Sequence, residues 1–189
     1  MKRTIVKSVL IFFVIAIIVL CAVYRLAYPL KLNMNTLPGK IADFYNQEDS
    51  LTIAVYDGVE IGNRAYYLIE VGEKLGSVTL EKGLNGRYRF THLGYGDGNF
   101  LDGIVEYKGK KYLLFGGRDL IGEIAGISVS IDGQTYNLNM QDADNIFLIC
   151  MQINGYTQDM HIDRDKISFF NDKGENITKL YDLSGGGIQ

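Results

Sequence analysis

Two histidines, His92 and His161, supply all the imidazole groups of the chain, so a proton relay or metal site must use one of them or do without. His92 lies in the segment THLGYGDGNFLDG, close in sequence to Asp97 and Asp102. A histidine beside a carboxylate can relay a proton. No serine or cysteine nucleophile with a local signature accompanies it. We therefore interpret His92 as the end of a strand and residues 94–102 as a connection that offers polar groups to a ligand.

The candidate ligand-binding residues are the polar and aromatic side chains of this segment: His92, Tyr95, Asp97, Asn99 and Asp102. Calcium takes about six or more oxygen ligands, and the loop from Asp97 contains several. It fails the EF-hand pattern, because Leu101 stands where an acid or amide belongs and Lys108 stands where a glutamate belongs. We expect neither a metal nor any other cofactor.

A second polar cluster surrounds His161. Its acids, Asp159, Asp163 and Asp165, are interleaved with the basic residues Arg164 and Lys166. Alternating charges are typical of a solvated face, so we predict no ion site there.

Carboxylate pairs provide the enzymatic alternative, because glycosidases use two carboxylates and need no histidine. The candidate pairs are Asp97 with Asp102 and Glu70 with Asp119. Cys150 lies within IFLICMQI, whose apolar side chains would hide the thiol and raise its pKa. We predict that Cys150 packs in the core.

Charge separates the chain into two parts. Residues 1–31 contain no acid and five basic side chains, which are Lys2, Arg3, Lys7, Arg25 and Lys31. The remainder has 14 basic and 22 acidic residues, a net charge of about −8. Such a surface repels phosphate backbones, so the composition excludes a nucleic-acid-binding role.

The N-terminal region predicts a membrane anchor. Residues 9–24 are consecutively apolar, with the basic cluster before them and Arg25 after them. We predict a cytoplasmic segment at 1–8 and a transmembrane signal-anchor helix at 9–27, with the amino end inside because of its basic excess. Two alternatives stay open: a cleaved signal peptide, for which Leu20-Cys21-Ala22 is a poor site, and lipidation at Cys21, where the bulky Leu20 departs from the usual pattern.

The rest of the chain predicts a mainly β fold. Residues 28–50 read as a juxtamembrane linker with a short helix at 40–47, and residues 184–189 as a disordered tail. Between them, residues 51–183 contain short β-branched and aromatic runs separated by glycine turns, which favours an antiparallel β-sandwich or barrel-like domain. Asp132-Gly133 is the strongest hairpin signal, and Lys108-Gly109 and Asn85-Gly86 are weaker ones.

Two stretches resemble each other, one beginning at Tyr66 and the other at Lys111. Each has a strand, a glycine, a charged pair and a second strand. An internal duplication and the shared chemistry of hairpin turns both account for this resemblance.

Together these features predict a single-pass membrane protein with its C-terminal domain in the extracellular or other extracytoplasmic space. The poverty of catalytic groups favours a non-enzymatic binding or accessory module for a protein, a peptide or a cell-envelope glycan. The alternatives are an envelope-acting hydrolase with a carboxylate pair, and a helper subunit whose helix recognises a larger membrane complex.

Overall fold

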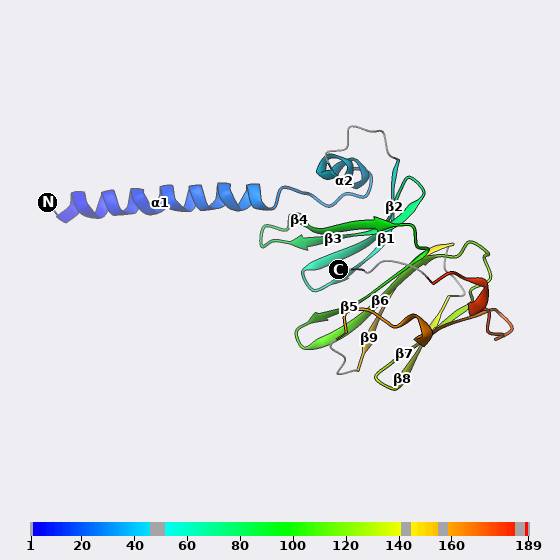
Figure 1. The fold of residues 1–189 in the computed structure, drawn as a ribbon. Coiled ribbons are helices and arrows are strands. Elements are labelled where there is room, and N and C mark those ends of the chain that lie inside the picture. The colour runs from blue at the N-terminus through cyan, green and yellow to red at the C-terminus, as the bar shows by residue number, and fades with distance from the viewer. Residues whose placement is uncertain (1, 46–51, 141–144, 155–158, 184–187, 189) are drawn as a thin grey trace.

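The computed structural model describes residues 2–45, 52–140, 145–154, 159–183 and 188. It begins with α1 (Lys2–Ala27), a helix that projects away from the rest of the chain (Figure 1). At 1.5 Å per residue, α1 is about 39 Å long. Its window Leu10–Ala27 has a mean hydropathy of 2.8, and none of it is buried. By length and composition α1 can cross a membrane, although a signal sequence would have the same properties.

A short helix, α2 (Leu37–Tyr45), follows α1. The sequence predicts this helix at 40–47, so it begins three residues earlier, and residues 46 and 47 lie outside the described part of the chain. The cause is local, because the Asn33 carbonyl accepts hydrogen bonds from the amides of Thr36 and Leu37 and turns the chain there. Pro38 fits in the first helical turn, where a backbone N–H would have no partner within the helix.

The first sheet has four antiparallel strands in the order β1-β2-β3-β4. They are β1 (Ile53–Ile61), β2 (Arg64–Val71), β3 (Lys74–Lys82) and β4 (Tyr88–Gly96). The two central strands are buried along most of their length because both of their faces are covered. One face packs on Ile41 of α2, and the other packs on the second sheet through Tyr66, Leu68 and Leu75.

The second and third sheets are also antiparallel, with the orders β5-β6-β9 and β10-β7-β8. Their strands are β5 (Phe100–Tyr107), β6 (Lys110–Arg118), β7 (Gly126–Ile131), β8 (Gln134–Asn139), β9 (Ile146–Ile153) and β10 (Ile167–Phe170). Two 3₁₀ turns, η1 (Arg164–Lys166) and η2 (Thr178–Leu180), flank β10.

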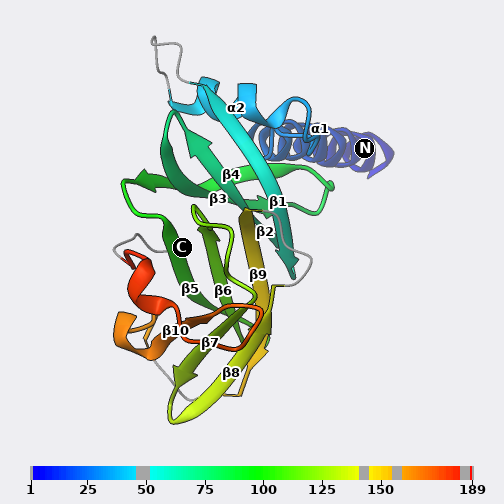
Figure 2. The ribbon, with the colours of Figure 1, turned by 90° about the vertical axis from the view of Figure 1, so that its right-hand side faces the viewer.

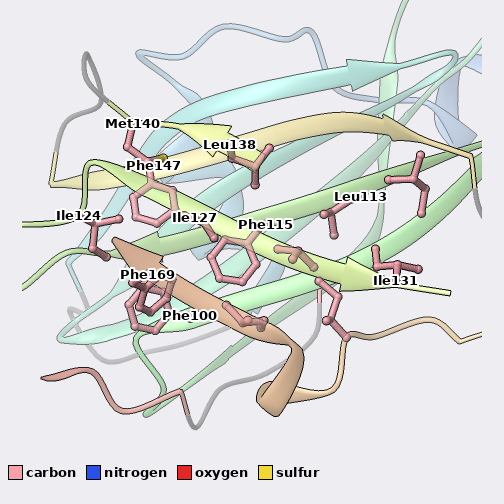
Figure 3. Packing of buried hydrophobic residues seen from close by; sticks show 14 of the residues in the cluster. Phe100, Leu113, Phe115, Ile124, Ile127, Ile131, Leu138, Met140, Phe147 and Phe169 are labelled. Atoms are coloured by element: carbon pink, nitrogen blue, oxygen red, sulfur yellow. The ribbon is translucent and has the colours of Figure 1, made fainter. Parts of the chain in front are cut away.

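The largest apolar cluster lies between the second and third sheets, with Phe100, Phe115 and Phe169 at its centre (Figure 3). The rings of Phe100 and Phe169 have centroids 4.9 Å apart, in the range of attractive aromatic pairs. Helix α2 and the three sheets therefore succeed one another as layers (Figure 2).

Two hairpin turns behave as predicted. Asp132 and Gly133 both have positive φ, at 51° and 74°, and join β7 to β8. Lys108 and Gly109 have φ of 51° and 73° and join β5 to β6. Positive φ at both central positions characterises the I′ turn, so both predictions are confirmed. At the third predicted turn only Gly86 has positive φ.

The prediction of a mainly β chain with antiparallel sheets and one apolar N-terminal helix is confirmed. A closed barrel is not seen in the described residues, since each sheet ends in two strands that have one neighbour each. The second strand predicted in the stretch that begins at Tyr66 is present as β3, KLGSVTLEK.

The two similar stretches are arranged differently. The first forms β2 and β3, which pair with each other. In the second, β6 and β7 belong to different sheets. Turn chemistry therefore accounts for the resemblance better than a duplication.

The connection predicted at residues 94–102 is shorter in the structure. Strand β4 continues to Gly96 and β5 begins at Phe100, which leaves residues 97–99 between them. Gly94 continues the ladder opposite Ser77. The backbones approach closely here, because a Cβ on Gly76 would lie 2.4 Å from the Gly94 carbonyl oxygen. Glycine in this region therefore serves strand pairing rather than a loop.

Candidate functional site

A cleft of about 470 Å³ lies between the first sheet and the β5–β6 hairpin. It is lined by Arg64, Thr79, Thr91, His92, Ile104, Val105, Glu106, Lys111, Asp159, Met160 and Ile188. The lining combines both signs of charge, hydroxyl groups and aliphatic side chains. A cleft with this lining can hold the polar groups of a ligand by hydrogen bonds and its apolar groups by contact with the aliphatic side chains.

A β-bulge in β4 shapes one wall of the cleft. Thr79 pairs with His92 and Leu80 pairs with Phe90, so Thr91 is left without a partner in the ladder. In a regular strand, neighbouring side chains point to opposite faces. The bulge shifts this alternation, and both Thr91 and His92 line the cleft. The Thr91 hydroxyl donates to the Thr79 carbonyl oxygen at 3.1 Å.

The outer edge of β5 is paired with segments from the end of the chain. The Ile104 amide donates to the Met160 carbonyl oxygen at 2.9 Å, and the Ile188 amide donates to the Asp102 carbonyl oxygen at 2.7 Å. Ile188 is buried, with 3% of its surface exposed. A Cβ on Gly103 would lie 2.3 Å from the Ile188 carbonyl oxygen, so only glycine leaves room for this contact.

The side chain of Asp102 lies on the other face of β5 from Leu101. The period of two along the strand places it with Phe100 and Ile104, whose side chains pack towards the third sheet. Asp102 Oδ2 accepts the Ile162 amide at 2.6 Å. Buried amides must have such partners, so this carboxylate fixes the segment that precedes η1.

Two basic side chains, Arg164 and His161, lie near the Asp102 carboxylate. Arg164 Nη1 is 2.9 Å from Oδ1, an ion pair without the alignment of a hydrogen bond. The His161 Nδ1 atom is 3.7 Å from Oδ2 and 3.2 Å from the backbone carbonyl oxygen of Asp102. The Asp102 side chain is only 1% exposed, so the fold uses this carboxylate internally.

The other candidate residues lie in the turn between β4 and β5 and at the end of β4. Asp97 is exposed and forms an ion pair with Lys74 at 3.0 Å. The Asn99 carbonyl oxygen accepts the Arg118 amide at 2.8 Å, while Tyr95 is 36% exposed on β4. Of the five candidates, His92 is the one that lines the cleft.

The carboxylate pairs proposed for a hydrolase are engaged elsewhere. Glu70 accepts hydrogen bonds from the Tyr56 hydroxyl and the Arg118 guanidinium, and the latter ties β6 to β2. Burial, followed by the hydrogen bond to Glu70, raises the pKa of Tyr56 to about 12. Glu70 therefore links the first and second sheets.

Asp119 organises the turn after β6. Its carboxylate accepts the amides of Gly122 and Ile124, each at 2.8 Å, and the hydroxyl of Tyr181 at 2.7 Å. Burial and the hydrogen bond to Asp119 raise the pKa of Tyr181 well above its ordinary value.

A separate cavity of about 640 Å³ adjoins this turn, and sequence reasoning does not anticipate it. Its acidic lining consists of Asp119, Glu123, Asp172 and Glu175, with Lys173 nearby. Within the described residues, no group of three or more histidine, cysteine or acidic side chains is arranged to hold a metal ion.

Cys150 packs against the cluster between the first and second sheets, and burial raises the pKa of its thiol. Cys150 therefore packs against the core, as predicted, but it is only partly buried.

Sequence reasoning misses most of the cleft lining because Arg64, Lys111 and Asp159 are far apart in the chain. Arg64 and Lys111 do share a local signal, since each follows a glycine-containing turn at the start of a strand. The position of the cleft depends on how the sheets stack, which no local pattern records. No protein-family model, no curated protein sequence and no solved structure matches this chain.

Proposed function

We propose that this chain is a single-pass membrane protein whose β-rich domain is a non-enzymatic binding module outside the membrane. The spanning segment is residues 9–27, and the basic cluster Lys2, Arg3 and Lys7 keeps the amino end in the cytoplasm. Two observations support the anchor: the window Leu10–Ala27 is wholly unburied, and Tyr24 and Tyr28 suit an interfacial layer at its end.

The binding domain is a layered β-sandwich in this proposal. Side chains from the facing sheets interdigitate on both sides of the second sheet, which supports the assignment. The layers leave the cleft beside β4, where the first sheet ends in an edge strand.

The ligand of the cleft is an extended peptide segment of a partner protein. The observation that carries this assignment is Ile188, a residue of this chain that lines the cleft and whose amide is bonded to β5. The wall of the cleft already pairs with an extended backbone at β5, which supports a second extended segment as the ligand. Beyond Tyr88, which pairs with Leu30, the outer edge of β4 offers further backbone groups, as in recognition by strand addition.

A glycan-cleaving function has weaker support. Glu70, Asp102 and Asp119 each hold buried or half-buried partners. A catalytic acid or nucleophile must instead face the substrate across a cleft. The arrangement therefore favours binding over hydrolysis.

Peptide selection tests the proposal directly. A random peptide library displayed on phage is selected against the full-length chain in lipid nanodiscs, and enriched peptides are measured on two variants. Thr91→Arg places a long side chain at the cleft, whereas Thr135→Arg makes the same change at an exposed position of another edge strand, β8. We expect affinity to fall at least about tenfold with Thr91→Arg, equivalent to about 1.4 kcal/mol, and to be unchanged with Thr135→Arg.

Failure to enrich any peptide contradicts the proposal. Equal binding to both variants also contradicts it, because it would place the ligand outside the cleft.

A further inference from the structure

The β3–β4 hairpin is bonded to the end of α1 (Figure 1). The Leu84 amide donates to the Tyr24 hydroxyl oxygen at 2.7 Å, and Arg87 Nε donates to the Tyr28 carbonyl oxygen at 3.0 Å. Leu30 and Tyr88 exchange two backbone hydrogen bonds, at 3.0 and 2.8 Å. Tyr24 belongs to the apolar window of α1, so these contacts hold the hairpin tip beside the last turns of that window.

The hairpin approaches the helix closely because of Gly83. A Cβ at this position would lie 2.8 Å from the Tyr24 hydroxyl oxygen and 2.9 Å from the Tyr28 ring. Both tyrosines therefore pack directly on the hairpin backbone. The hairpin and the end of α1 are therefore packed against each other and are not joined by the connecting chain alone.

Leu84 at the tip of the hairpin is 99% exposed. A large aliphatic side chain gains nothing from water and gains free energy on entering an apolar phase. It lies next to a helix whose apolar window is itself unburied. The same apolar phase can therefore cover both Leu84 and the apolar window of α1.

A groove of about 700 Å³ lies between the hairpin and α1. Its apolar side is formed by Leu20, Cys21 and Leu84, with Tyr24 beside them. Its charged lining is entirely basic and consists of Arg25, Lys31 and Arg87. An apolar groove rimmed by cations fits a molecule with a hydrocarbon chain and an anionic head.

We propose that the hairpin, residues 83–87, is seated in the membrane interface and that this groove binds an anionic phospholipid of the same bilayer. Leu84 enters the acyl boundary, and the three cations bind the lipid phosphate. The inference rests on the proposed membrane anchor. It adds that the β domain is docked on the bilayer surface by two elements, which fixes the orientation of the cleft.

The chain contains no tryptophan, so Leu84→Trp introduces a single reporter at the hairpin tip. The full-length variant is reconstituted in nanodiscs of phosphatidylcholine with phosphatidylglycerol, in which either lipid carries bromine as a quencher. We expect blue-shifted emission, and quenching at least about twofold stronger with brominated phosphatidylglycerol than with brominated phosphatidylcholine at equal mole fraction. Leu120→Trp, at an exposed position after β6, is the matched control and should stay solvent-exposed and unquenched.

Lys31→Glu in the Leu84→Trp background tests the headgroup. We expect the preference for phosphatidylglycerol to disappear, because a carboxylate replaces one of the three cations of the groove. Matching circular dichroism spectra show that each variant is folded.

The outcomes separate the two proposals. A chain that does not co-purify with the discs overturns the membrane anchor and the hairpin docking together. Retention of the Leu84→Trp variant in the discs with unquenched tryptophan emission overturns the docking alone. Equal quenching by both lipids, or a preference that Lys31→Glu leaves intact, overturns the assignment of an anionic phospholipid.

Discussion

Asp102→Asn should destabilise the domain without acting through a ligand. The substitution keeps the shape of the side chain and an oxygen that can accept the Ile162 amide. It removes the negative charge that lies 2.9 Å from Arg164. An arginine cannot lose its proton to relieve the imbalance. The cost should therefore appear in the free energy of unfolding.

The magnitude follows from the burial of the two partners. Breaking a fully buried ion pair costs about 3–5 kcal/mol, and breaking an exposed one costs about 0–1 kcal/mol. The Asp102 side chain is 1% exposed, but that of Arg164 is 32% exposed and can be partly hydrated. We expect about 2–3 kcal/mol for Asp102→Asn, which corresponds to a decrease in Tm of about 4–12 °C in a domain of this size.

The assay is thermal and urea unfolding of the full chain in a mild detergent, followed by tyrosine fluorescence and circular dichroism. Asp163→Asn is the matched control, because Asp163 pairs with Lys166 at 2.6 Å but has a side chain that is 65% exposed. It should cost less than about 1 kcal/mol. Equal effects of the two substitutions would refute the assignment of Asp102 as an internal partner. Loss of peptide binding by Asp102→Asn at unchanged stability would also refute it.

Three further predictions concern other contacts. Ile188→Ala should lower the free energy of unfolding by about 2 kcal/mol and speed amide exchange at residue 188, because it removes a buried side chain. Unchanged amide exchange would contradict the packing of Ile188. Lys108→Asn should raise the free energy of unfolding by about 0.5–1 kcal/mol, because asparagine tolerates the φ of 51° better than lysine. A lower urea midpoint would contradict this prediction. The folded state holds the Tyr56 proton more tightly than the unfolded chain, as its pKa of about 12 exceeds the ordinary value of about 10. The contribution of Tyr56 to the free energy of unfolding should be full below about pH 10 and be lost as the pH rises through about 12. Tyr56→Phe should therefore flatten the fall in stability over this pH range, measured by urea titrations. Parallel falls in the two proteins would contradict the prediction.

The elements of the fold that depend on residues adjacent in the chain could be predicted from the sequence. Sixteen consecutive apolar residues predict the helix at the amino end, and Asp132-Gly133 predicts its hairpin, because positive φ is a property of the turn residues themselves. The burial of β3 on both faces could not be predicted, because it comes from the layers on either side rather than from the composition of the strand. Register shifts such as the bulge at Thr91 are also set by the partner strand.

The candidate site likewise has features that the sequence indicates and features that only the tertiary structure shows. The sequence directs attention to His92, which lines the cleft. It groups His92 with Asp102 because they are close along the chain, yet strand alternation places the Asp102 side chain on the third-sheet side with Arg164. Proximity along the chain does not decide which face a strand residue occupies.

By itself the sequence determined an apolar N-terminal helix, a mainly antiparallel β fold and two of its hairpin turns, because each depends on composition or on neighbouring residues. Only the tertiary structure decided that the sheets stack in layers, that Ile188 lines the cleft, and that the hairpin carrying Leu84 contacts the end of α1. These contacts join residues that are distant along the chain, and they form because buried apolar surface and backbone groups must find partners that local sequence does not specify.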